Sequence, residues 1–239
     1  MTRIFGLIVT LLFSQLAFAA SVPDFPFVVS VGHAEREVTP DTATISLDIM
    51  SFEKDSKLAL KAANLATTQL METLKKNGVP EANVEASDIE KATKRRRDEY
   101  RTLDILGYEV SRTIKIKLDD LSKYSELMSD LVAIDNLSKA ETIFDVSNRR
   151  EIEAELMEEA SKDAREKAER MAGSLGTKIQ SVYAISQKSN FGEFFATFGV
   201  LEPPIGAFMM VGNDSHTTVM FVPDSISVEQ SINVVFRIK

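Results

Sequence analysis

Two segments of this chain alternate apolar and polar residues one by one. Within residues 41–52, apolar residues occupy every second position from Ala43 to Ile49, and the same alternation in residues 106–118 is interrupted once, by Arg112. A period of two is typical of a strand with one face buried and the other in water. The apolar positions are Ala43, Ile45, Leu47 and Ile49 in the first segment and Leu106, Tyr108, Val110, Ile114, Ile116 and Leu118 in the second. The chain therefore contains half-buried β-strands.

Three other segments show the spacing of helices. They are residues 55–77, 121–133 and 148–175, of which the last is the longest and is rich in alanine. In the first of them Asp55 or Ser56 can cap the start, and Gly78 followed by Pro80 stops the helix. Its apolar stripe predicts the buried face and consists of Leu58, Ala62, Leu65, Ala66, Leu70 and Leu74.

Helices and strands alternate in a way that indicates an α+β fold. Further strands are predicted at residues 27–31, 84–94, 140–146, 179–187 and 226–238. Residues 27–31 and 41–52 are close enough in sequence to form a hairpin. Hairpins beside crossover helices favour mixed, mainly antiparallel sheets packed with the long Ala-rich helix and two shorter helices. We expect one domain over residues 20–239, or two subdomains at about 27–118 and 119–239.

The N-terminus has the parts of a secretory signal peptide. Arg3 precedes an apolar run from Ile4 to Phe18, and the triplet Ala17-Phe18-Ala19 offers a cleavage site before Ala20. The run is shorter than the roughly 20 residues that cross a bilayer. We therefore expect residues 1–19 to be removed and the mature protein to work in the periplasm. The chain has no cysteine, so an ordinary hydrophobic core must stabilise it.

The charge of the chain argues against nucleic acid as a partner. The formal net charge is −8, and removal of Arg3 with the signal peptide makes it one unit more negative. An acidic protein repels phosphates, and export separates it from chromosomal DNA.

Residues that commonly carry catalysis are scarce. The chain has only His33 and His216, and its serines form no nucleophile motif such as G-x-S-x-G. Neither histidine has metal-ligand spacing to a second histidine, although His216 lies near Asp214. We expect a non-enzymatic protein with no catalytic residues, no metal site and no cofactor.

A basic cluster stands out in this acidic chain. It surrounds a predicted hairpin turn and consists of Lys91, Lys94, Arg95, Arg96, Arg97 and Arg101. Adjacent arginines can bind an anionic surface, such as lipid phosphates or an acidic patch of a neighbouring subunit. The alternative is a solvated hairpin tip. Arg95, Arg96 and Arg97 are the candidate contacts with an anionic partner.

Residues 190–210 are the most informative segment. They hold five of the fourteen phenylalanines, together with glycines and Pro203-Pro204. Glycine and proline argue against a regular core element, yet this much apolar surface is costly to leave in water. The same subunit, a subunit interface or a membrane surface can cover it, and methionine with aromatic residues favours an interface over a membrane. The candidate contact residues are Phe191, Phe194, Phe195, Phe198, Phe208, Met209 and Met210.

The order of several short segments resembles the SIMPL domain, which includes the YggE-like proteins and the periplasmic immunogenic proteins of Gram-negative bacteria. These segments are VTPDTATI at 38–45, NGV at 77–79, GY at 107–108, DAREKAE at 163–169 and the strand at 226–236. The resemblance covers about residues 27–239. It implies an α+β domain exported to the periplasm or outer surface, large ring-like homo-oligomers, and an association with oxidative-stress tolerance. It supplies no site residues.

Two functions fit these features. The first is a periplasmic protein that self-assembles into homo-oligomers, with peripheral membrane or envelope contacts, and has an envelope or oxidative-stress role. The second is a periplasmic binding protein that holds a small hydrophobic ligand between the long helix and the Phe-rich segment, since such pockets have apolar and aromatic linings.

Overall fold

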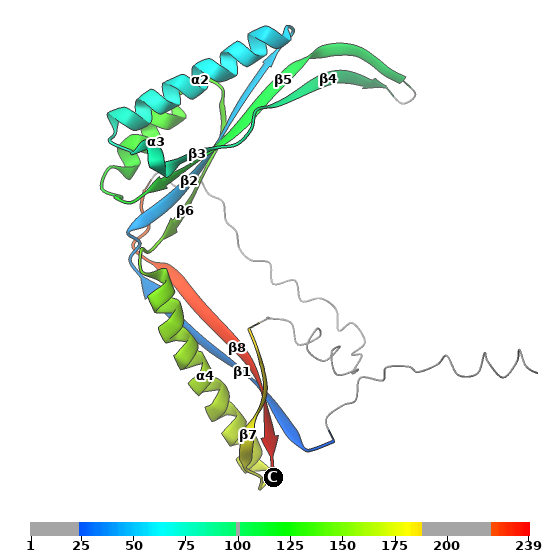
Figure 1. The fold of residues 1–239 in the computed structure, drawn as a ribbon, viewed down its shortest axis with the longest axis vertical. Helices are drawn as coiled ribbons and strands as arrows, with labels where there is room; N and C mark the ends of the chain where they lie inside the picture. The colour runs from blue at the N-terminus through cyan, green and yellow to red at the C-terminus, as the bar shows by residue number, and fades with distance from the viewer. Residues whose placement is uncertain (1–23, 99–100, 188–220) are drawn as a thin grey trace, which may run out of the picture. The chain divides into compact units, whose positions relative to one another are not determined.

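The protein has an α+β fold with two antiparallel sheets, as the sequence predicts (Figure 1). The computed structural model describes residues 24–98, 101–187 and 221–239. The described residues form two compact units, which we describe separately. Unit 1 contains residues 24–35, 154–187 and 229–239, and unit 2 contains residues 36–153 and 221–228 apart from the pair 99–100.

Unit 2 is built on a five-stranded sheet. Its strands are β2 (Thr42–Glu53), β3 (Val84–Ala86), β4 (Glu90–Asp98), β5 (Arg101–Leu118) and β6 (Leu137–Asp145). Their order is β3-β5-β2-β6, and β4 also pairs with β5. Ile45 lies opposite Ile116 in the antiparallel ladder of β2 and β5, so both point to the same face. Both are fully buried in the core.

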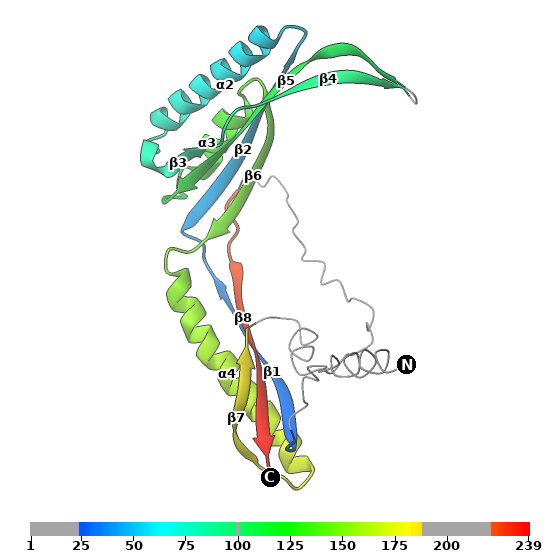
Figure 2. The same cartoon turned by 45° about the vertical axis from the view of Figure 1, so that its right-hand side comes forward.

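Two helices cover the apolar face of this sheet (Figure 2). They are α2 (Ser56–Lys76) and α3 (Tyr124–Val132), and a short 3-10 helix (Glu81–Asn83) leads from α2 to β3. The Asp55 carboxylate caps α2 because its Oδ1 accepts hydrogen bonds from the backbone N–H groups of Lys57 (2.8 Å) and Leu58 (3.2 Å). Beyond the helix end, Gly78 has a φ of 78°, which glycine adopts without steric cost.

The predicted buried stripe of α2 is partly wrong. Leu58 is 55% exposed and Leu65 is 59% exposed. The buried residues are Ala59, Ala63, Ala66, Leu70 and Leu74. The small alanine side chains let the first half of the helix lie close to the sheet, and this position turns the two leucines toward solvent.

Unit 1 contains a three-stranded sheet and most of the longest helix. Its strands β1 (Phe27–Val38), β8 (Ile226–Ile238) and β7 (Ile179–Ser186) pair in the order β1-β8-β7. Helix α4 (Arg149–Ser174) buries a stripe of alanines consisting of Ala160, Ala164, Ala168 and Ala172. A Cβ atom on Gly32 of β1 would overlap the carbonyl oxygen of Ala160. Helix and strand can therefore approach this closely only because residue 32 is glycine.

Two predicted strand arrangements are wrong. The first two strands do not form a hairpin in the described part of the chain, because β1 belongs to the three-stranded sheet and β2 to the five-stranded sheet. The predicted strand at 84–94 is interrupted at residues 87–89 and forms the separate strands β3 and β4. Strand β1 pairs with β8 from the far end of the chain, whereas β3 and β4 both pair with β5.

Candidate functional site

Strand β4 and the first half of β5 form a two-stranded ribbon that runs out beyond the neighbouring strands of unit 2 (Figures 1 and 2). The ladder places Glu90 opposite Ser111 and Asp98 opposite Arg101, with register shifts at Lys94/Arg95 and between Arg95 and Arg97. In the described part of the chain β4 pairs with β5 alone, so its other edge is open. An open strand edge presents backbone N–H and C=O groups that can pair with another chain.

The ribbon carries the predicted basic cluster, with all of its residues except Arg101 on the open strand β4. Lys91, Lys94, Arg95 and Arg96 are all exposed. Lys94 forms an ion pair with Glu109 on β5, with 2.7 Å between Nζ and Oε1. The structure places the backbones of Arg97 and Arg101 in the ladder near the hairpin turn, opposite Thr102 and Asp98, while their side chains lie outside the described residues. The structure thus brings the four described basic side chains, Lys91, Lys94, Arg95 and Arg96, to one strand of a protruding ribbon.

Apolar side chains are exposed where the ribbon joins the sheet. Met50 is 41% exposed, Phe52 is 51% exposed and Ile105 is 46% exposed. The Phe52 ring lies over Gly107, where an added Cβ would be 2.6 Å from its Cζ atom. The sequence contains a signal for this exposure, because Met50 and Phe52 are in phase with the polar residues Ser46 and Asp48 of the alternating strand. The alternation alone predicts a polar outer face and misses these two residues.

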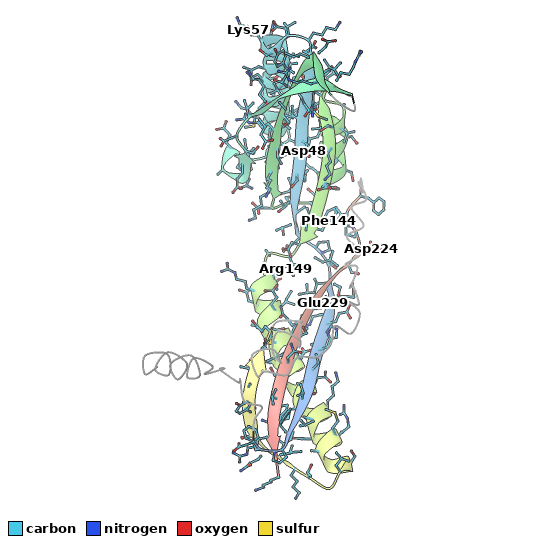
Figure 3. All side chains as sticks on the ribbon, turned by 90° about the vertical axis from the view of Figure 1, so that its right-hand side faces the viewer. Asp48, Lys57, Phe144, Arg149, Asp224 and Glu229 are labelled. Atoms are coloured by element: carbon cyan, nitrogen blue, oxygen red, sulfur yellow. The ribbon has the colours of Figure 1, made fainter. Side chains whose placement is uncertain are left out.

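A polar hollow of about 250 Å³ lies on the solvent face of the same sheet. Figure 3 shows Asp48 midway along its strands. Asp48 Oδ1 accepts a hydrogen bond from Thr113 Oγ1 at 2.7 Å, and Ser138 Oγ donates to the Asp48 backbone oxygen at 3.0 Å. Among the described residues, no histidine lines the hollow. These hydroxyls and carboxylates can form hydrogen bonds, but the hydroxyl–carboxylate pair of Thr113 and Asp48 lacks a histidine, the most common general base.

A larger, mainly apolar hollow of about 450 Å³ lies between α2 and β3. Met71, Leu74, Val79 and Val84 supply its apolar lining, with Thr67 and Thr68 beside them. Its volume is in the range of small-molecule pockets.

The remaining predicted sites are only partly within the described structure. His33 is exposed, and its Nε2 lies 3.9 Å from Glu35 Oε2, whereas His216 and the Phe-rich contact residues, Phe191 to Met210, lie outside the described residues. Among the residues described, no three His, Cys, Asp or Glu side chains group as metal ligands. In the same residues, none of the helices combines the length and apolar character that crossing a lipid bilayer requires.

Comparison with known proteins identifies relatives along most of the chain. Residues 28–236 match the model of the SIMPL family, which is described as a protein family of unknown function (DUF541). The uncharacterized protein YggE of Edwardsiella ictaluri is 25% identical over 175 residues, which cover 72% of this chain and 73% of the relative. The 26 kDa periplasmic immunogenic protein of Brucella abortus is 22% identical over 223 residues, 89% of this chain and 84% of the relative. YggE of Escherichia coli K12 is 29% identical over 116 residues, 47% of this chain and 45% of the relative.

Proposed function

The chain belongs to the SIMPL family, and from that premise we propose that it is a non-enzymatic periplasmic protein that self-assembles into homo-oligomers and has an envelope or oxidative-stress role. The exposed β4–β5 ribbon is the observation that carries the assembly proposal. It combines an open strand edge with exposed basic side chains and exposed apolar residues at its base. Surfaces of this kind are typical of protein contacts.

The periplasmic location is supported by the relatives. Two Brucella proteins that match this chain are named periplasmic. The finer proposal is that residues 1–19 are a cleaved signal peptide. The mass of the exported protein tests this proposal, because cleavage before Ala20 lowers the mass by that of residues 1–19. Retention of Met1 to Ala19 would contradict the proposal.

The non-enzymatic proposal is supported by the lining of the polar hollow, which among the described residues contains no histidine or cysteine and in which the Asp48 carboxylate accepts a hydrogen bond from the Thr113 hydroxyl. The stress role is supported by the family resemblance alone. It predicts that cells lacking the protein survive peroxide less well and recover when it is restored.

The native mass of the mature protein tests self-assembly. We expect size exclusion with light scattering at near-physiological salt to give a mass several times that of one subunit. A monomeric mass across the micromolar range would overturn the proposal.

A second candidate function is the binding of a small hydrophobic ligand, which the apolar hollow between α2 and β3 favours. Native mass spectrometry of freshly purified protein would then show a bound molecule, and Val84→Glu would abolish its retention because the carboxylate enters the apolar lining. Protein that carries no added mass and binds no apolar probe would rule out this candidate.

A further inference from the structure

Two segments of the chain carry dense charge of opposite sign. Residues 91–97 of β4 hold five basic residues among seven and no acidic residue. Residues 151–159, in the first half of α4, hold five glutamates among nine and no basic residue. The two runs therefore have equal and opposite formal charge.

Four charged side chains in each segment are exposed, although Lys94 pairs with Glu109, and half-buried Glu153 pairs with Arg149. Arg95 and Arg96 are exposed and form no ion pair within the part of the chain that the structure describes. On α4, Glu151, Glu155 and Glu158 are exposed and follow the spacing i, i+4, i+7. Residues at this spacing lie on one side of a helix, here within about 10 Å along its axis. The three glutamates thus make a continuous acidic face.

The pattern disfavours contacts between identical surfaces. Two β4 edges paired with each other would set lysine and arginine against lysine and arginine, and two acidic faces would set glutamate against glutamate. Like charges placed opposite each other destabilise a contact, whereas complementary charges steer partners together. A two-fold contact made by either surface with itself is therefore unfavourable.

We propose that the basic edge of β4 in one copy docks on the acidic face of α4 in a second copy. The inference rests on the proposed self-assembly and names the two surfaces that meet. Exposed Ile105, which lies opposite Arg95 in the ribbon ladder, adds apolar area beside the charges. Since the two surfaces differ, the contact is heterologous, so repetition produces a closed ring or an open chain.

Charge reversal tests the contact on both sides. One variant combines Arg95→Glu with Arg96→Glu, and the other combines Glu155→Lys with Glu158→Lys. At a concentration where the wild-type protein is assembled, each variant alone is expected to lose most of its assembled fraction, because each then opposes like charges. Wild-type assembly is also expected to weaken at least tenfold between 0.05 and 1 M salt, roughly as screening of exposed charges predicts.

A mixture of the two variants provides the decisive measurement. The reversed ribbon of the first variant is acidic and the reversed helix of the second is basic, so they attract each other, and the assembled mass is expected to return. A chain that carries all four substitutions is expected to assemble as well. Matched controls reverse exposed charges elsewhere, with Lys57→Glu and Lys61→Glu for the first variant and Glu81→Lys and Glu85→Lys for the second. These controls are expected to keep the wild-type mass.

The outcomes separate this inference from the proposed function. An assembled wild-type protein whose mass is unchanged in both charge-reversal variants would overturn the β4–α4 contact and leave self-assembly standing. Loss of mass in the variants without recovery in the mixture would also overturn it, because general destabilisation would then explain the loss. A monomeric wild-type protein would overturn both proposals.

Discussion

The Asp163 carboxylate joins helix α4 to strand β1 within unit 1. It accepts hydrogen bonds from Lys167 Nζ and, at 2.9 Å, from the backbone N–H of His33. Both donors favour the charged form and so hold the pKa of Asp163 below its usual value, and Lys167 contributes more to this shift than His33. His33 follows Gly32, where strand and helix are in closest contact. A charged hydrogen bond therefore reinforces a contact that small residues make possible.

Replacing Asp163 is expected to change how stability depends on pH. The folded pKa lies below the unfolded value of about 3.9, so the stabilisation is complete above pH 5 and disappears as the pH falls through the folded pKa. Asp163→Asn is expected to lower the free energy of unfolding by about 1 kcal/mol at pH 7. The difference from wild type should be smaller at pH 2.5 than at pH 7, because protonation removes the charge that the two donors favour.

Urea unfolding at the two pH values measures this difference. Glu166→Gln is the matched control, because Glu166 makes only a 4.0 Å pair with Lys162 on the surface of α4. An equal loss of stability by Asp163→Asn at both pH values would contradict the electrostatic explanation.

At the scale of elements, local patterns predict where helix α2 begins and ends but not which side of it is buried. Asp55, Gly78 and Pro80 mark the ends directly. The buried side depends on how closely the helix approaches the sheet, and the small side chains of Ala59 and Ala63 permit a close approach. Hydrophobicity alone ranks leucine above alanine, so it favours burial of Leu58 and Leu65 instead.

The same limit applies to strand pairing and to the candidate site. The sequence predicts that the basic cluster surrounds a hairpin turn, because charge and turn position are local properties. It does not predict that β1 pairs with β8, since that pairing joins residues from opposite ends of the chain. The sequence does not predict the open edge of β4 either, because an edge is open or covered depending on which strands pair in the whole sheet.

Two substitutions of identical chemistry test the buried side of α2. Leu70→Ala is expected to cost about 2–5 kcal/mol of unfolding free energy, because Leu70 is fully buried and its truncation leaves a cavity. Leu65→Ala is expected to change stability by less than about 0.5 kcal/mol, because Leu65 is 59% exposed. Thermal and urea unfolding measure both. Equal losses at the two positions would show that Leu65 is buried in the protein in solution.

At the scale of the whole molecule, the densest charge and the densest aromatic sequence lie in different segments of the chain. The charged surfaces lie on β4 and α4, and the densest aromatic sequence lies at residues 190–210. Charged contacts set orientation and partner choice, whereas apolar burial supplies most of the free energy of stable association. Assembly is therefore expected to depend on both kinds of surface.

Removing the aromatic residues tests the apolar part. Replacing residues 191–210 by a Gly/Ser sequence of equal length is expected to lower the assembled mass severalfold, because the replacement removes five phenylalanines and two methionines that an interface would bury. The strands are expected to remain folded, since every strand that the structure describes lies outside this segment. Light scattering measures the mass and circular dichroism the strand content. A variant that stays fully assembled would exclude the segment from the interface, and loss of strand signal would show that it packs on its own subunit.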